Sequence, residues 1–141
     1  MAGRRIGRVV FAATKADHVP AIRRDHLLHL LESLSDPARV RQTGRGAGVT
    51  YQVAASLLST EDGTARIDGR PVQVVRGVRL GEDKVRAFHV GEVPVSMPPA
   101  DFWTEAFFEM PVFRPPPLDP WKGLPHLGLD RVLDDLIGDI L

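Results

Sequence analysis

The chain has 141 residues, of which 43% are hydrophobic and 26% are charged, and this suits one globular domain or a piece of a larger one. It contains no cysteine, which excludes a disulfide framework and a cysteine-based zinc site and is consistent with a cytosolic protein. No apolar run reaches the length of a membrane span, so we expect no transmembrane segment. The apolar segment after the N-terminal arginines is too short for a secretory signal.

Positive and negative charges are equal in number, but they are unevenly distributed along the chain. Residues 1–50 contain nine Lys/Arg and four Asp/Glu, whereas residues 101–141 contain three and eight. A basic N-terminal part could face phosphates or nucleic acid. Nucleic-acid modules usually interleave basic and aromatic residues, however, and the only aromatic ring in the first fifty positions is Phe11. We therefore expect no nucleic-acid partner; the two charged ends attract each other or are solvated.

The first predicted element is a strand over residues 6–13, a short apolar run typical of a buried parallel strand. It leads into Thr14-Lys15-Ala16-Asp17, the pattern by which many GTPases select guanine. The Asp17 carboxylate can accept hydrogen bonds from the guanine ring N–H and exocyclic amino group, which adenine does not present at those positions. Lys15 can lay its methylene stem across the base, and the Thr14 hydroxyl can hold the loop. The alternative is a solvated turn, because a four-residue pattern also arises by chance.

A helix and a second strand follow this loop. Pro20 suits a first helical turn, and Ser35-Asp36-Pro37 ends the helix. A glycine-rich connector at 44–48 precedes a strand over 49–55; a phosphate cradle is the alternative for this connector, but such cradles usually precede a helix. Strand, helix and strand together predict the βαβ unit of an α/β sheet. The apolar residues at helical spacing are Ile22, Leu27, Leu30, Leu31 and Leu34.

The sequence changes in character from residue 59 onward. Glycines separate short alternating runs, such as 70–75 and 85–90, which predict β-hairpins in a small antiparallel sheet. A short helix over 101–109 would expose aromatic side chains to a partner. An apolar stripe over 129–140, with aspartates mostly opposite, predicts an amphipathic helix that covers the sheet. The aromatic side chains are Phe102, Trp103, Phe107 and Phe108.

Several stretches occur in an order typical of one family. They are Phe-Ala-Ala-Thr-Lys-Ala-Asp-His-Val at 11–19, Val-Ala-Ala-Ser at 53–56, Phe-Trp at 102–103, Phe-Arg-Pro at 113–115, Pro-His-Leu-Gly-Leu-Asp at 125–130 and Gly-Asp at 138–139. With them the chain resembles the YcjX-like family of bacterial P-loop GTPases over essentially its whole length. The aromatic and proline segments are the more specific part, since the nucleotide motif is shared by many GTPases.

The resemblance implies an α/β fold, with part of a Ras-like P-loop GTPase sheet, an added small antiparallel β subdomain and a C-terminal amphipathic helix. We expect the C-terminal part of a GTPase domain at 1–58 and a hairpin and Pro/aromatic-rich insertion at 59–122. The helix at 123–141 would pack back on the GTPase domain. Stress-related roles are implied by the resemblance alone.

The resemblance also implies binding of GTP or GDP through two loops. The second loop would bring a backbone N–H near Ala55 to the guanine carbonyl oxygen, and its small residues allow close approach. This loop does not keep the usual Ser-Ala order. The nucleotide-binding residues implied are Thr14, Lys15, Asp17, Ala54, Ala55 and Ser56.

The phosphate-binding machinery is missing from this chain. A P-loop contains Gly-Lys, and the sequence has no such dipeptide. Asp135-Leu136-Ile137-Gly138 matches an Asp-x-x-Gly element formally, but it follows the base motif and falls on the last helix. We therefore expect no GTP hydrolysis by the chain alone, and Mg²⁺ binding only in an intact protein that includes the missing N-terminal part of the GTPase domain.

Other functions compete with this interpretation. In one, segment 94–121 is the working surface of a non-catalytic protein-interaction module. In another, His26 and His29 bind a metal, but a third ligand is not evident and a polar helix edge is the simpler role. His18 could touch the nucleotide edge or cap the helix, and we favour a structural role. We interpret the aspartates at 130, 134, 135 and 139 as a solvated helix face.

Overall fold

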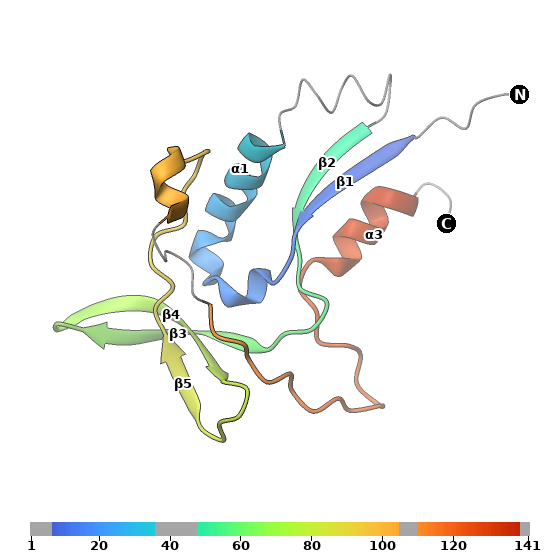
Figure 1. Ribbon diagram of the computed structural model, residues 1–141. Helices are drawn as coiled ribbons and strands as arrows, with labels where there is room; N and C mark the ends of the chain where they lie inside the picture. Colours follow the sequence, from blue (N-terminus) through green and yellow to red (C-terminus); the bar gives the residue numbers. More distant parts are fainter. Residues whose placement is uncertain (1–6, 36–47, 105–109, 139–141) are drawn as a thin grey trace, which may run out of the picture.

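The computed structural model describes residues 7–35, 48–104 and 110–138, and it is a mixed α/β structure (Figure 1). It contains a two-stranded parallel sheet and a three-stranded antiparallel sheet. Both sheets were expected from the sequence, and both are confirmed.

The parallel sheet is a βαβ unit. Strand β1 (Arg8–Ala13) is followed by two 3-10 turns, η1 (Ala16–His18) and η2 (Ala21–Arg23), and then by helix α1 (Arg24–Leu34). Strand β2 (Gly48–Val53) then pairs in parallel with β1 along its whole length. Because the strands are parallel and in register, their carboxyl ends lie next to each other, where open α/β sheets bind ligands.

Two helices cover this strand pair. Helix α1 contacts both strands, and so does helix α3 (Leu129–Ile137), which lies on the other side of the pair in Figure 1. The side chains of β1 from Val9 onward are half-buried, not fully buried as a central parallel strand would be. The reason is that each strand has one β-neighbour among the described residues.

The C-terminal helix is confirmed, but its apolar stripe is only partly covered. Leu133, Leu136 and Ile137 remain between 39% and 49% exposed. Gly128 precedes the helix with φ +62°, and a Cβ there would lie 2.3 Å from the Val53 carbonyl oxygen. Glycine therefore allows the helix to begin directly against the end of β2.

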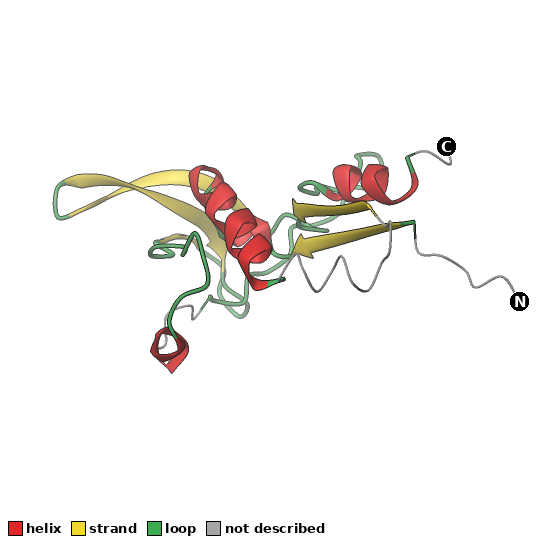
Figure 2. Ribbon diagram, turned by 90° about the horizontal axis from the view of Figure 1, so that it is seen from above, coloured by secondary structure: helices red, strands yellow, loops and turns green. Residues whose placement is uncertain are grey.

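The antiparallel sheet has the order β3-β4-β5. Its strands are β3 (Thr60–Ile67), β4 (Arg70–Val78) and β5 (Val85–Phe88). Asp68 and Gly69, both with positive φ, form the two-residue turn between β3 and β4, as a tight hairpin requires. The β3–β4 hairpin extends to one side of the molecule, with α1 between it and the parallel strands (Figure 2).

The best-packed apolar core belongs to this second sheet. Val75, Val90 and Phe113 form a buried cluster against which Phe88 and Met110 pack. The segment carrying Phe113 lies along the end of β4: N–H groups at residues 80 and 114 bond to carbonyl oxygens at residues 112 and 78, each at 2.7 Å. The core thus lies beside the loop that follows β1.

The described part of the aromatic segment forms a 3-10 turn, η3 (Ala100–Thr104), and the rest of the helix expected over 101–109 lies outside the described residues. Trp103 is 49% exposed and Phe102 packs edge-on against it. Phe107 and Phe108 lie outside the described residues. None of the described helices is long and apolar enough to cross a membrane.

Candidate functional site

The loops after β1 and β2 are bonded to each other. The Ala54 N–H donates to the Ala13 carbonyl oxygen at 2.9 Å, and the Ala16 N–H donates to the Ala54 carbonyl oxygen at 3.1 Å. These bonds continue the parallel ladder past the ends of both strands. They bring the Thr-Lys-Ala-Asp loop and the Ala-Ala-Ser loop, 40 residues apart in sequence, to one place.

The first loop contains a backbone conformation that is uncommon for its residue. Lys15 has φ +56° and ψ +32°, in the left-handed region that non-glycine residues seldom adopt. The Lys15 side chain is exposed, whereas the five residues 16–20 that follow are the longest unbroken buried run in the described chain. A residue held in this conformation by a tightly packed surrounding is typical of ligand-binding sites.

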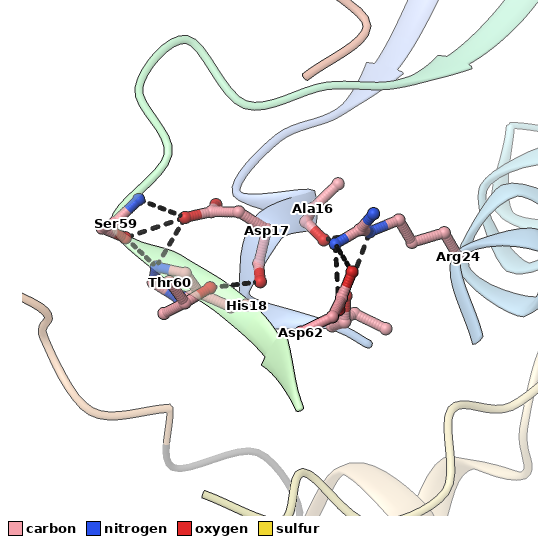
Figure 3. A network of polar contacts seen from close by, with 8 residues as sticks. Ala16, Asp17, His18, Arg24, Ser59, Thr60 and Asp62 are labelled. Carbon is pink, nitrogen blue, oxygen red and sulfur yellow. Dashed lines mark hydrogen bonds and ion pairs between the residues drawn. The ribbon is translucent and has the colours of Figure 1, made fainter. Parts of the chain in front are cut away.

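The Asp17 carboxylate is buried and already hydrogen-bonded. Its side chain is 2% exposed, and Oδ2 accepts bonds from the N–H and the hydroxyl of Ser59, both at 2.8 Å (Figure 3). The Thr60 hydroxyl donates to the Asp17 carbonyl oxygen. No hydrogen bond to Oδ1 is found within the described residues. Of the two carboxylate oxygens, Oδ2 is therefore the one that the protein engages.

A second set of contacts fixes the loop from the side of α1. The Arg24 Nε donates to the carbonyl oxygens of Ala16 and Val19, each at 3.1 Å, and its Nη2 contacts the Asp62 carboxylate at 3.2 Å. Asp62 in turn accepts a bond from the Ala21 N–H at 3.0 Å. Figure 3 shows these contacts on the opposite side of the loop from Ser59. The loop is thus held between α1 and the beginning of β3.

His18 links the loop to the apolar core. Its Nε2 lies 3.1 Å from the Ser59 hydroxyl oxygen, and its ring meets the Phe113 ring edge-on at 4.9 Å. Burial lowers the pKa of His18 below its ordinary value, although nearby Asp17 raises it and Lys15 lowers it further. Burial thus favours the neutral form of the His18 imidazole.

In the second loop the Ala55 N–H is engaged within the protein. It donates to the Leu127 carbonyl oxygen at 2.9 Å, and the Leu127 N–H returns the bond. This antiparallel bridge is the reason that Ala55 is buried. Ser56, the next residue, is exposed, and its N–H has no partner within the described residues.

One cavity of about 520 Å³ lies where the two loops meet, which is within the usual size range of small-molecule sites. Phe113 and Val132 contribute apolar walls. The residues singled out in the sequence all line it: Thr14, Lys15, Asp17, Ala54, Ala55 and Ser56.

Sequence reasoning missed the residues that hold this loop in place. For His18 it weighed a contact with the nucleotide edge and a helix cap, and it favoured a structural role. Ser59, Thr60 and Asp62 lie 38 to 43 positions from the groups they bind. No local pattern marks such pairs. The one available signal is a run of polar side chains at 59–62, where the glycine-separated part of the sequence begins.

The other polar candidates have structural partners. His26 Nδ1 lies 3.3 Å from the Val93 carbonyl oxygen, and His29 Nδ1 lies 3.4 Å from the Glu32 carboxylate. Within the described residues there is no group of three or more His, Cys, Asp or Glu side chains suited to a metal ion.

Asp135, of the formal Asp-x-x-Gly match, joins α3 to the strand pair. Its carboxylate accepts a bond from the Gln52 amide at 2.7 Å, and its carbonyl oxygen accepts one from Arg8 at 3.0 Å. These contacts give Asp135 a packing role on the last helix.

Comparison with known proteins identifies the family of this chain. A family model described as "YcjX-like family, DUF463" matches residues 1–141. The chain belongs to the YcjX-like family. This YcjX-like chain is 35% identical over 136 residues to the Ras-like GTPase YcjX of Escherichia coli, and 33% identical over 141 residues to the Ras-like GTPase YcjX of Shewanella oneidensis.

The two alignments cover nearly all of the YcjX-like chain but little of its relatives. They include 96% and 97% of this chain and 29% of each relative. The chain therefore spans less than a third of the length of the curated relatives it matches.

Proposed function

We propose that this chain is the C-terminal portion of a YcjX-like GTP-binding protein and supplies its guanine-recognition site. The observation that carries the proposal is the Asp17 carboxylate, fixed at the wall of a cavity formed by the loops after two parallel strands. A buried acceptor at this position selects a base with N–H donors, because a base without them would leave the carboxylate unpaired.

The hydrogen bonds that the loop residues already make decide which of their atoms we assign to guanine. We assign the guanine N–H groups to Asp17 Oδ1, since Oδ2 accepts two bonds from Ser59. The exposed Lys15 lays its methylene stem on the base, and Thr14 lines the same cavity. We assign the guanine carbonyl oxygen to the Ser56 N–H, beside Ala54 and Ala55, because the Ala55 N–H is engaged by Leu127.

Hydrolysis belongs to the longer protein in this proposal. Phosphoryl transfer depends on a glycine-rich loop, its Lys and a bound Mg²⁺, and this chain has no Gly-Lys dipeptide. The proposed division is a partial Ras-like P-loop domain at 1–58, the antiparallel insertion at 59–122 and a returning helix at 123–141, in a protein of the cytoplasm. The names of the relatives support the GTPase assignment.

The interaction-module alternative has one supporting observation. Segment 94–121 exposes the apolar side chains of Met97, Trp103 and Leu118. Such a surface fits a protein partner and is compatible with nucleotide binding elsewhere on the chain. We keep this role as a prediction.

The proposed function can be tested on the chain itself by titrating it with nucleosides and following backbone amide NMR signals. We expect guanosine, and more weakly inosine, to shift the signals of residues 14–18 and 54–57 at millimolar concentration, because inosine lacks the exocyclic amino donor. Adenosine should leave these signals in place. Equal shifts with adenosine, or none with guanosine, would contradict the proposal.

A further inference from the structure

The inference concerns Ser59, which stands between Asp17 and His18. Its hydroxyl oxygen lies 2.8 Å from Asp17 Oδ2 and 3.1 Å from His18 Nε2. Both neighbours are largely buried, whereas Ser59 is half-buried and lines the cavity. Ser59 is neither in the Thr-Lys-Ala-Asp loop nor in the Ala-Ala-Ser loop.

The number of protons decides the direction of both bonds. A serine hydroxyl has one hydrogen, and an ionised carboxylate can only accept. The Ser59 hydroxyl must therefore donate to Asp17. Its oxygen then accepts from His18, which requires the proton of the neutral imidazole to be on Nε2.

The surroundings hold His18 in the orientation that this chain of bonds needs. Phe113 packs edge-on against the imidazole ring, and Gly77 makes room for Phe113. A Cβ at Gly77 would lie 2.7 Å from the Phe113 ring and 3.0 Å from the Ser59 carbonyl oxygen. The antiparallel sheet thus positions both His18 and Ser59.

We propose that Ser59 is a positioning residue for guanine selectivity, and that His18 fixes the direction of its hydroxyl. With Oδ2 held by two Ser59 donors, the carboxylate cannot rotate, and Oδ1 keeps its place for the base. This inference rests on the proposed function, in which Asp17 reads guanine. It adds that the antiparallel insertion controls the selectivity for guanine, through the residues just before and at the start of β3.

The first test needs neither nucleotide nor mutation. Nitrogen-15 chemical shifts of the histidine side chains distinguish the two neutral tautomers, and we expect His18 in the Nε2–H form at pH 7.5. The Nδ1–H form would overturn the inference, because Ser59 would then donate to His18 and not to Asp17.

The second test compares Ser59→Ala, Ser59→Thr and a control, Ser33→Ala, whose hydroxyl bonds only within α1. In the guanosine titration, Ser59→Ala should bind about tenfold more weakly, the effect of losing one hydrogen bond to a charged group. Ser59→Thr keeps the hydroxyl and should remain within about threefold of the original chain, and so should Ser33→Ala.

The outcomes separate the two proposals. If the original chain discriminates guanosine from adenosine and Ser59→Ala binds guanosine equally well or more tightly, the positioning role is wrong and the proposed function stands. If the original chain does not discriminate guanosine from adenosine, the proposed function fails. The His18 tautomer still shows whether the hydrogen bonds from His18 to Ser59 and from Ser59 to Asp17 exist. If Ser59→Ala is unfolded by its amide spectrum, the tautomer and Ser59→Thr decide the question.

Discussion

Single residues in this structure have roles that depend on what lies against them. Asp17 carries the proposed recognition, but its geometry is set by Ser59, His18 and, indirectly, by Gly77. A carboxylate with one oxygen fixed by protein donors is more selective than a mobile one, because it cannot turn to suit another base. Two predictions follow from this at the level of side chains.

Acidification should destabilise the fold through His18. Burial lowers the His18 pKa in the folded state, so the unfolded chain binds a proton more readily than the folded one. The free energy of unfolding should therefore fall as the pH drops from above 6.5 toward the lower folded-state pKa. Urea unfolding at a series of pH values measures this. His18→Gln, which cannot be protonated, should lose that part of the pH dependence, and an identical profile in the variant would refute the assignment.

A methyl group at Gly77 should disturb the site, whereas one at Gly63 should not. The Gly77 Cβ would meet the Phe113 ring and the Ser59 backbone, which cannot move easily. The Gly63 Cβ would meet the aliphatic stem of Arg76, a flexible side chain that can move aside. We expect Gly77→Ala to lower the free energy of unfolding by about 1–3 kcal/mol more than Gly63→Ala does. Thermal unfolding of both variants gives the comparison; equal effects would show that the packing around Phe113 is not tight.

At the level of elements, the loop after β1 is the junction of the molecule. It contacts Ala54 just after β2, Arg24 at the start of helix α1, and residues 59–62 just before and at the start of strand β3. The parallel unit and the antiparallel sheet are therefore connected through the candidate site itself. A substitution in one sheet can therefore alter the geometry of the site even where the substituted residue does not line the cavity.

Removal of the Arg24 guanidinium should show the strength of this junction. Arg24→Met keeps the apolar stem but leaves the carbonyl oxygens of Ala16 and Val19 without that donor. We expect a loss of about 1–3 kcal/mol in the free energy of unfolding, mainly from these two oxygens. Faster hydrogen exchange at residues 16–20 should accompany the loss. Arg66→Met, at an exposed position of β3, is the matched control and should change the free energy of unfolding and the hydrogen exchange little. Equal losses in the two variants would argue against the role of Arg24 in holding the loop.

The elements themselves could be predicted from sequence to different degrees. The unit of β1, α1 and β2 was predictable because apolar side chains recur with strand and then helical period, and the hairpins because glycines separate alternating runs. The burial of β1 was overestimated, since a two-stranded sheet cannot cover it as a wide sheet would. Residues 101–104 form a 3-10 turn where a helix was expected.

The position of the candidate site was predictable from the sequence, but the hydrogen bonds that hold its residues in place were not. Lys15 and Asp17 follow a strand in a recognisable pattern, and parallel pairing brings Ala54 and Ser56 beside them. The bonds from Ser59 and Thr60, and the bridge that occupies the Ala55 N–H, join segments far apart in the chain. These contacts depend on tertiary structure, and no periodic pattern in the sequence marks them.

At the level of the whole molecule, the chain combines the proposed guanine-recognition site with a sequence that contains no phosphate-binding loop. We expect the chain alone to release no phosphate from GTP in the presence of Mg²⁺, measured against a buffer blank. The physical reason is that no group would stabilise the charge on the transferred phosphoryl group, and none would position the attacking water. Turnover above the blank that persists after repeated purification would disprove this.

The most direct test of the central claim, that the Asp17 carboxylate reads the purine, is the base preference of Asp17→Asn. An amide at this position presents an N–H donor, so the variant should lose guanosine-induced shifts and gain shifts with xanthosine, whose ring carbonyl can accept that donor. The control Asp25→Asn, on the exposed part of α1, should keep the original preference for guanosine. An Asp17→Asn chain that folds normally and still prefers guanosine would contradict the account.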